Sequence, residues 1–120
     1  MKLLDTNIII YASSPNYAHL LPLVQDPDNA YSHISYVETL GFQQLSTSEF
    51  NYYNSILMLL HPLPVSFLVI QRAAELKRNY KIKLGDSLIA ATALVHNLPI
   101  YTRNEADFKK IAGITVVNPV

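Results

Sequence analysis

Short apolar runs alternate with segments of helical character from one end of the chain to the other, and this alternation limits the possible folds. Strands and helices that alternate in this way are typical of a parallel sheet covered by helices. The 120 residues suffice for one hydrophobic core, so we expect a single α/β domain over residues 1–120. Strands are expected near Lys2–Leu4, Ala30–Ile34, Leu63–Val65, Pro99–Thr102 and Thr115–Val117.

Three longer segments are expected to form helices. Ser46 and Glu49 have the spacing of a capping box, and Ser66 can cap the next helix. Residues 84–97 contain strong helix formers, and their alanines allow close packing on a sheet. These helices are expected over Ser46–Leu60, Ser66–Asn79 and Leu84–Asn97.

The first of these helices carries apolar residues on nearly all sides. Phe50, Tyr53, Leu57 and Leu60 form one stripe, and a second stripe consists of Tyr52, Ile56 and Leu59. A small domain can hardly cover both stripes, so we expect the helix to lie in an interface with a second copy or a partner peptide. A helix buried in the core is the alternative.

The composition excludes several classes of site. The chain has no cysteine, so a metal must be held by oxygen or imidazole, and a reducing cytoplasm is the expected setting. The longest apolar stretch is interrupted by His61, Pro62 and Pro64, and no export signal is visible. The four histidines lack metal-ligand spacing, and the three glycines form no phosphate-binding loop.

The net charge is zero, but the charges are unevenly distributed. Residues 1–71 hold one basic and five acidic side chains, whereas residues 72–120 hold eight basic and four acidic ones. Such a basic half can bind a phosphate backbone. Taken singly, lysines and arginines more often lie on helix faces that are exposed to solvent. The candidates are Lys81, Lys83 and Arg103, together with Arg72, Lys77, Arg78, Lys109 and Lys110.

Acidic and amide residues follow the expected strands or open the helices beside them. In an open parallel sheet the carboxyl ends of the strands form one edge, where ligands bind. Acids that converge there repel one another, and a divalent cation relieves that repulsion; oxygen ligands favour Mg²⁺ or Mn²⁺. Asp5 follows the first strand, Glu38 lies past the second at an expected helix start, Asp86 opens the third predicted helix, and Asn104 and Asp107 follow the fourth strand.

Each of these residues also has a local structural explanation. Asp5 can cap the turn that begins at Thr6. Glu38 stands three residues after Ser35, and this spacing by itself favours a capping box. Asp86 can stabilise a helix start through the macrodipole, and Asn104 with Asp107 can be an N-cap and third-position pair.

Four sequence blocks in order resemble the signature blocks of PIN domains, particularly those of VapC-like bacterial toxins. They are "LLDTNIII" at the N-terminus, "ISYVETLGF" around residue 38, "KLGDSLIAATAL" around residue 86 and "IYTRNEADF" over 100–108. The resemblance covers essentially the whole chain. It implies a five-stranded parallel sheet with helices on both faces, and an acidic pocket that hydrolyses RNA with Mg²⁺ or Mn²⁺.

The resemblance also implies roles for individual residues. Asp5 and Asp86 would bind the metal, and Glu38 would help to position metal or water. Thr102 would contact a ligand or orient a carboxylate, while Thr6 and Asn7 would brace the turn at Asp5. Many PIN domains carry an aspartate where this chain has Asn104, and others pair an asparagine there with an acid three residues later, as Asp107 is here. The division of labour between these two catalytic candidates stays open.

The predicted function is a metal-dependent endoribonuclease, the toxin of a toxin–antitoxin pair. The resemblance implies a homodimer that a cognate antitoxin neutralises. A PIN-like module that binds RNA or a partner without catalysis is the alternative, and a metal-dependent phosphatase is more distant, because Asn7 stands where such enzymes have a second aspartate.

Overall fold

Five short parallel strands form the centre of the molecule, in the order β3-β2-β1-β4-β5. The computed structural model describes residues 1–120. The chain builds β1, β2 and β3 to one side and then returns to add β4 and β5 on the other, so the strand order reverses beside β1. The strands are β1 (Leu3–Leu4), β2 (Ala30–Ser32), β3 (His61–Leu63), β4 (Ile100–Tyr101) and β5 (Val116–Val117).

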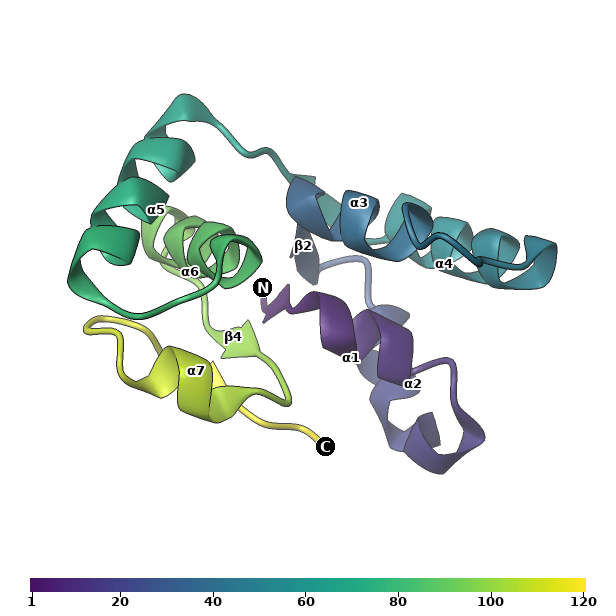
Figure 1. The fold of residues 1–120 in the computed structure, drawn as a ribbon. Coiled ribbons are helices and arrows are strands. Elements are labelled where there is room, and N and C mark those ends of the chain that lie inside the picture. Colours follow the sequence, from purple (N-terminus) through teal and green to yellow (C-terminus); the bar gives the residue numbers. More distant parts are fainter.

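Helices cover both faces of the sheet, so the expected α/β fold is confirmed (Figure 1). Neighbouring residues of β1 point to opposite faces: Leu3 packs with α5, α6 and α7, whereas Leu4 packs with α1, α2 and α4. The helices are α1 (Thr6–Tyr11), α2 (Leu21–Val24), α3 (His33–Leu40), α4 (Thr47–Leu59), α5 (Phe67–Asn79), α6 (Leu84–His96) and α7 (Glu105–Lys109), with a 3₁₀ segment at Pro15–Leu20.

Four of the five strands are shorter than the sequence indicates and the third is shifted by two residues, and two boundaries differ for identifiable reasons. The second strand ends at Ser32, because its side chain caps α3 and the helix begins at the next residue. The third strand begins at His61 and includes Pro62, although proline lacks the N–H group that a central strand needs. Proline is tolerated there because β3 is an edge strand.

The three long helices begin where the sequence predicts. Ser46 and Glu49 form both hydrogen bonds of the capping box at the start of α4. The Ser66 hydroxyl accepts the Val69 N–H at 3.2 Å and caps α5.

No helix combines the length with the apolar character that crossing a bilayer requires.

The interface predicted for the Ser46–Leu60 helix cannot include Ile56, and the rest of that interface stays a prediction. Ile56 is only 6% exposed and packs in the core of its own domain. Tyr52 is half-buried, and its hydroxyl donates to the Ala12 carbonyl oxygen. The helix is largely a core helix, because α1, α3 and β3 all pack against it. Its exposed apolar side chains are instead Phe50, Met58 and Leu59.

Candidate active site

The carboxylate of Asp5 is fixed at the point where the strand order reverses. Asp5 directly follows β1, is 4% exposed and caps α1, since its Oδ1 accepts the Thr6 N–H at 2.8 Å. Its Oδ2 accepts a hydrogen bond of 2.7 Å from the hydroxyl of Thr102, which directly follows β4. The capping role expected from local sequence is therefore present, but it occupies only one of the two oxygens.

The surroundings of Asp5 oppose the ionisation of its carboxyl group. Burial raises the pKa of Asp5 to about 6, the Thr102 hydrogen bond opposes this shift, and the charges of Asp86 and Glu38 add to it. An acid with a raised pKa in a polar edge of the sheet marks a candidate functional site. The cost of ionising Asp5 here decreases when a cation binds beside it.

Glu38 joins the site through a long-range contact. Helix α3 is capped by Ser32, so the capping box predicted for Ser35 and Glu38 is wrong, and Glu38 lies in the second half of α3 instead of at its start. The Glu38 Oε1 atom accepts a hydrogen bond of 2.7 Å from the Thr6 hydroxyl. This hydrogen bond ties α3 to the start of α1, directly beside Asp5.

Asp86 approaches from α6, on the other side of the sheet. It stands in the first turn of that helix, where the macrodipole favours a negative charge, as one local explanation expected. Burial raises the pKa of Asp86, and the nearby carboxylates of Asp107 and Glu38 raise it further, while Lys83 and Lys110 oppose the shift. Asp86 therefore lies within electrostatic range of all the other acids of the site.

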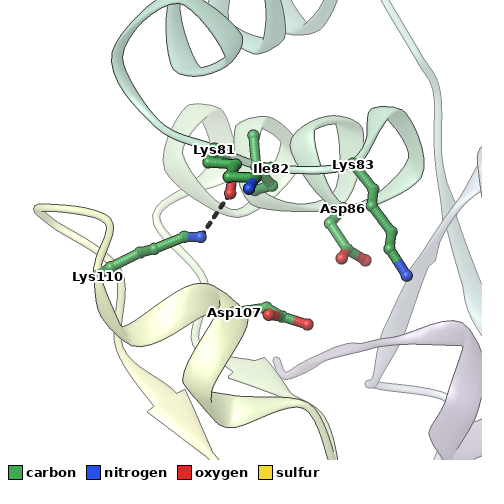
Figure 2. Close-up of a pocket in the computed structure, with 6 residues that line it drawn as sticks. All are labelled: Lys81, Ile82, Lys83, Asp86, Asp107 and Lys110. Carbon is green, nitrogen blue, oxygen red and sulfur yellow. Dashed lines mark hydrogen bonds between the residues drawn. The ribbon is translucent and has the colours of Figure 1, made fainter.

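The fourth sequence block contributes differently through Asn104 and Asp107. Asn104 occupies the N-cap position of α7, but its side chain makes no capping hydrogen bond, and its N–H donates to the Thr102 hydroxyl at 3.0 Å. Asp107 stands one turn further along α7 and lines the same pocket as Asp86 (Figure 2). The structure thus brings the carboxylate of Asp107 to the acids, whereas Asn104 holds the loop through its backbone.

A pocket rich in lysine adjoins these acids (Figure 2). Its volume is about 450 Å³, and the Lys110 ammonium group donates to the Lys81 carbonyl oxygen at its wall. Arg103, which the sequence also suggests for this role, lies over the Tyr11 ring at 4.8 Å from its centroid and does not line the pocket. We call this the lysine pocket; its residues are Lys81, Ile82, Lys83, Asp86, Asp107 and Lys110.

The donor set fits a hard divalent cation that keeps part of its water shell. All the candidate ligands are carboxylate oxygens, which Mg²⁺ and Mn²⁺ prefer. No three histidine, aspartate or glutamate side chains are close enough to hold an ion by themselves. Mg²⁺ usually takes only one or two direct carboxylates together with waters, so Asp5 and Asp86 could hold such an ion, and Glu38 and Asp107 could bind its waters.

Two residues near the acids were missed by the sequence analysis as parts of the site. The hydroxyl of Ser35 lies 2.8 Å from that of Thr6, and Gly85 lies against the Glu38 carboxylate. The spacing of Ser35 and Glu38 fits one helix face as well as a capping box, and the structure shows the common face. Asn7, expected to brace the Asp5 turn, donates to the Thr102 hydroxyl at 3.3 Å.

The sequence model of the PIN domain matches residues 2–114. The chain belongs to the PIN domain family. This membership confirms the family resemblance that the four blocks indicate. Solved structures of toxin–antitoxin proteins are also similar to the chain. A chain of a toxin–antitoxin complex from Klebsiella pneumoniae is similar over 100% of this chain and 98% of its own length, with 33% identity and a TM-score of 0.81.

Two further structures support the VapC-like type of this PIN domain. FitAcB from Neisseria gonorrhoeae matches with 31% identity and a TM-score of 0.78, covering 99% of this chain and 98% of its own. VapBC2 from Rickettsia felis, bound to a promoter DNA fragment, matches with 25% identity and a TM-score of 0.76, covering 98% and 97%. No curated protein sequence matches the chain.

Proposed function

We propose that this PIN domain is a metal-dependent endoribonuclease and the toxin of a toxin–antitoxin pair. The observation that carries the proposal is the convergence of four carboxylates beside a pocket lined by three lysines. Acids that raise one another's pKa oppose folding, so such a cluster is better explained by a bound cation than by stability. The lysines supply positive charge for a phosphate backbone.

Each group then has a distinct task in phosphodiester hydrolysis. Asp5 and Asp86 hold the ion, Glu38 and Asp107 orient water, and Thr102 fixes the Asp5 carboxylate. The ion, when bound, makes water more acidic and stabilises the charge on the reacting phosphate. Asn104 acts by holding the loop after β4 at Thr102.

The direct test is the cleavage of single-stranded RNA by the purified protein with Mg²⁺, with Mn²⁺ and with a chelator. Internal cleavage that requires either cation supports the proposal. Tight RNA binding without cleavage under all conditions would instead favour the non-catalytic module, and an acid-stable phosphoenzyme would favour the phosphatase.

We expect the lysine pocket to bind the RNA backbone. Changing Lys81, Lys83 and Lys110 to glutamine removes three charges, and each lost phosphate contact should lower the log–log salt dependence of single-strand binding by about 0.7. Fluorescence anisotropy across a salt series measures this slope. The matched control changes Arg72, Lys77 and Arg78 of α5 to glutamine, and equal losses in both triple variants would argue against the pocket.

This chain has a groove beside the candidate site that suits an antitoxin segment. A groove of about 250 Å³ lies between α1, α3 and α4, and its lining combines four apolar side chains with the acids Glu38 and Glu49. We propose that an antitoxin segment with apolar and basic side chains binds there, close enough to Glu38 to inhibit cleavage. The groove residues are Ile10, Glu38, Thr39, Phe42, Leu45, Glu49 and Tyr53.

The homodimer stays a prediction, which light scattering tests.

A further inference from the structure

A chain of two buried hydroxyl groups ends on the Glu38 carboxylate. The Thr6 hydroxyl donates to Glu38 Oε1 at 2.7 Å and lies 2.8 Å from the Ser35 hydroxyl. An ionised carboxylate can only accept, so the single proton of Thr6 points to Glu38 and Ser35 must donate to Thr6. Ser35 is fully buried and Thr6 is 8% exposed, so bulk water competes little for the hydrogen bond between them. The bond from Thr6 to Glu38 is partly buried, because the Glu38 side chain is exposed.

The second oxygen of Glu38 lies against the backbone of Gly85. A Cβ atom on Gly85 would be 3.0 Å from Glu38 Oε2, which is tighter than an ordinary van der Waals contact. Gly85 stands in the first turn of α6, where backbone N–H groups lack helical acceptors and favour a nearby negative charge. A side chain at position 85 would therefore force the Glu38 carboxylate to move by a few tenths of an ångström.

We propose that Ser35, Thr6 and Gly85 are positioning residues that hold the Glu38 carboxylate in the orientation that metal binding, and with it cleavage, requires. This inference rests on the proposed function. Glu38 has a flexible side chain on a helix surface, so it needs external contacts to keep one orientation. The hydroxyl chain fixes one oxygen, and the close approach of α6 limits the other. We call these three residues the Glu38 socket.

The variant Gly85→Ala tests the socket without removing any polar group. The new methyl group displaces the end of a flexible side chain, so folding loses little, and alanine favours the helix more than glycine. We expect an equal or higher melting temperature, a kcat lowered roughly tenfold with KM within about twofold, and weaker Mn²⁺ binding in calorimetry. The adjacent variant Leu84→Ala, which changes an exposed side chain, is the control.

The hydroxyl chain is tested by a pair of variants at Thr6. Thr6→Val keeps the shape but removes the donor, so we expect losses similar to those of Gly85→Ala. Thr6→Ser keeps the donor and should restore both kcat and Mn²⁺ affinity, which a role in packing alone does not predict. Ser35→Ala should cause a smaller loss, because Thr6 can still donate to Glu38.

The Mn²⁺ titration separates failure of the socket from failure of the proposed function. If the wild-type protein binds Mn²⁺ but cleaves no RNA, the nuclease proposal fails, and weaker Mn²⁺ binding by Gly85→Ala still supports the socket. If Gly85→Ala and Thr6→Val match the wild type in Mn²⁺ affinity and in any cleavage, the socket is overturned. Equal losses in Thr6→Ser and Thr6→Val would also overturn it.

Discussion

Replacing Asp86 by asparagine is expected to lower RNA cleavage by about a thousandfold or more. The change removes a proposed metal ligand, and metal assistance contributes several kcal/mol to such reactions, with each tenfold in rate corresponding to about 1.4 kcal/mol. It also removes a carboxyl group whose ionisation is opposed by burial and by the carboxylates of Asp107 and Glu38. The metal-free variant should therefore melt at an equal or higher temperature than the wild type.

The same substitution should suppress the stabilisation by metal. At a free cation concentration a hundred times its dissociation constant, binding stabilises the folded wild type by about 2.7 kcal/mol, or roughly 10 °C in a chain of this size. Differential scanning calorimetry with Mg²⁺ and Mn²⁺ measures this shift beside the cleavage rate. Stability and activity should change in opposite directions, as at a site where acids are held together for function.

An exposed acid provides the control for this experiment. Asp28 lies in the turn before β2, and Asp28→Asn should keep the melting temperature, the metal-induced shift and the cleavage rate of the wild type. If the wild-type melting curve ignores both cations at millimolar concentration, and Asp86→Asn cleaves RNA normally, the metal site does not exist.

The stability of the metal-free protein is expected to fall as the pH rises from about 4 to above 6. The pKa of Asp5 is about 6 in the folded protein, against 3.8 for an unperturbed aspartate, which applies to the unfolded chain. Within this window the folded state binds more protons than the unfolded state, so each increase in pH favours unfolding. The full difference corresponds to about 3 kcal/mol at neutral pH.

Comparison of wild type and Asp5→Asn isolates this contribution, because Asp86 has a raised pKa as well. Asparagine cannot ionise, so the free energy of unfolding of the variant should depend less steeply on pH. The altered hydrogen bond to Thr102 changes this free energy by the same amount at every pH and does not affect the slope. Saturating Mg²⁺ should flatten the slope in the wild type, since the cation stabilises the ionised carboxylate. Chemical denaturation across this pH range measures both effects. Equal pH dependence of the free energy of unfolding in wild type and Asp5→Asn would contradict the raised pKa of Asp5.

The sequence determined the fold class and the edge of the sheet on which the acids meet. Alternating strand and helix patterns are local, and parallel topology places the carboxyl ends of all strands at one edge, so Asp5 and the block after β4 were expected at the same edge. The helix starts at Ser46 and Ser66 were also predictable, because capping depends on residues three apart.

Only the tertiary structure decided which side chains complete the site. The spacing of Ser35 and Glu38 fits both a capping box and a common helix face, and the choice depends on Thr6, which is distant in sequence. The exposure of Ile56 likewise depends on the elements that cover α4, which no periodicity within the helix reveals.

The division between Asn104 and Asp107 is a further example. Both residues lie at the start of α7, and their spacing alone made either of them a candidate for the fourth position. The packing of α7 against α6 brings Asp107 into the same pocket as Asp86, and α6 lies so close to α3 that a side chain at position 85 would press on the Glu38 carboxylate. Such choices arise from the packing of whole helices, because side-chain direction depends on how each helix is rotated against the sheet.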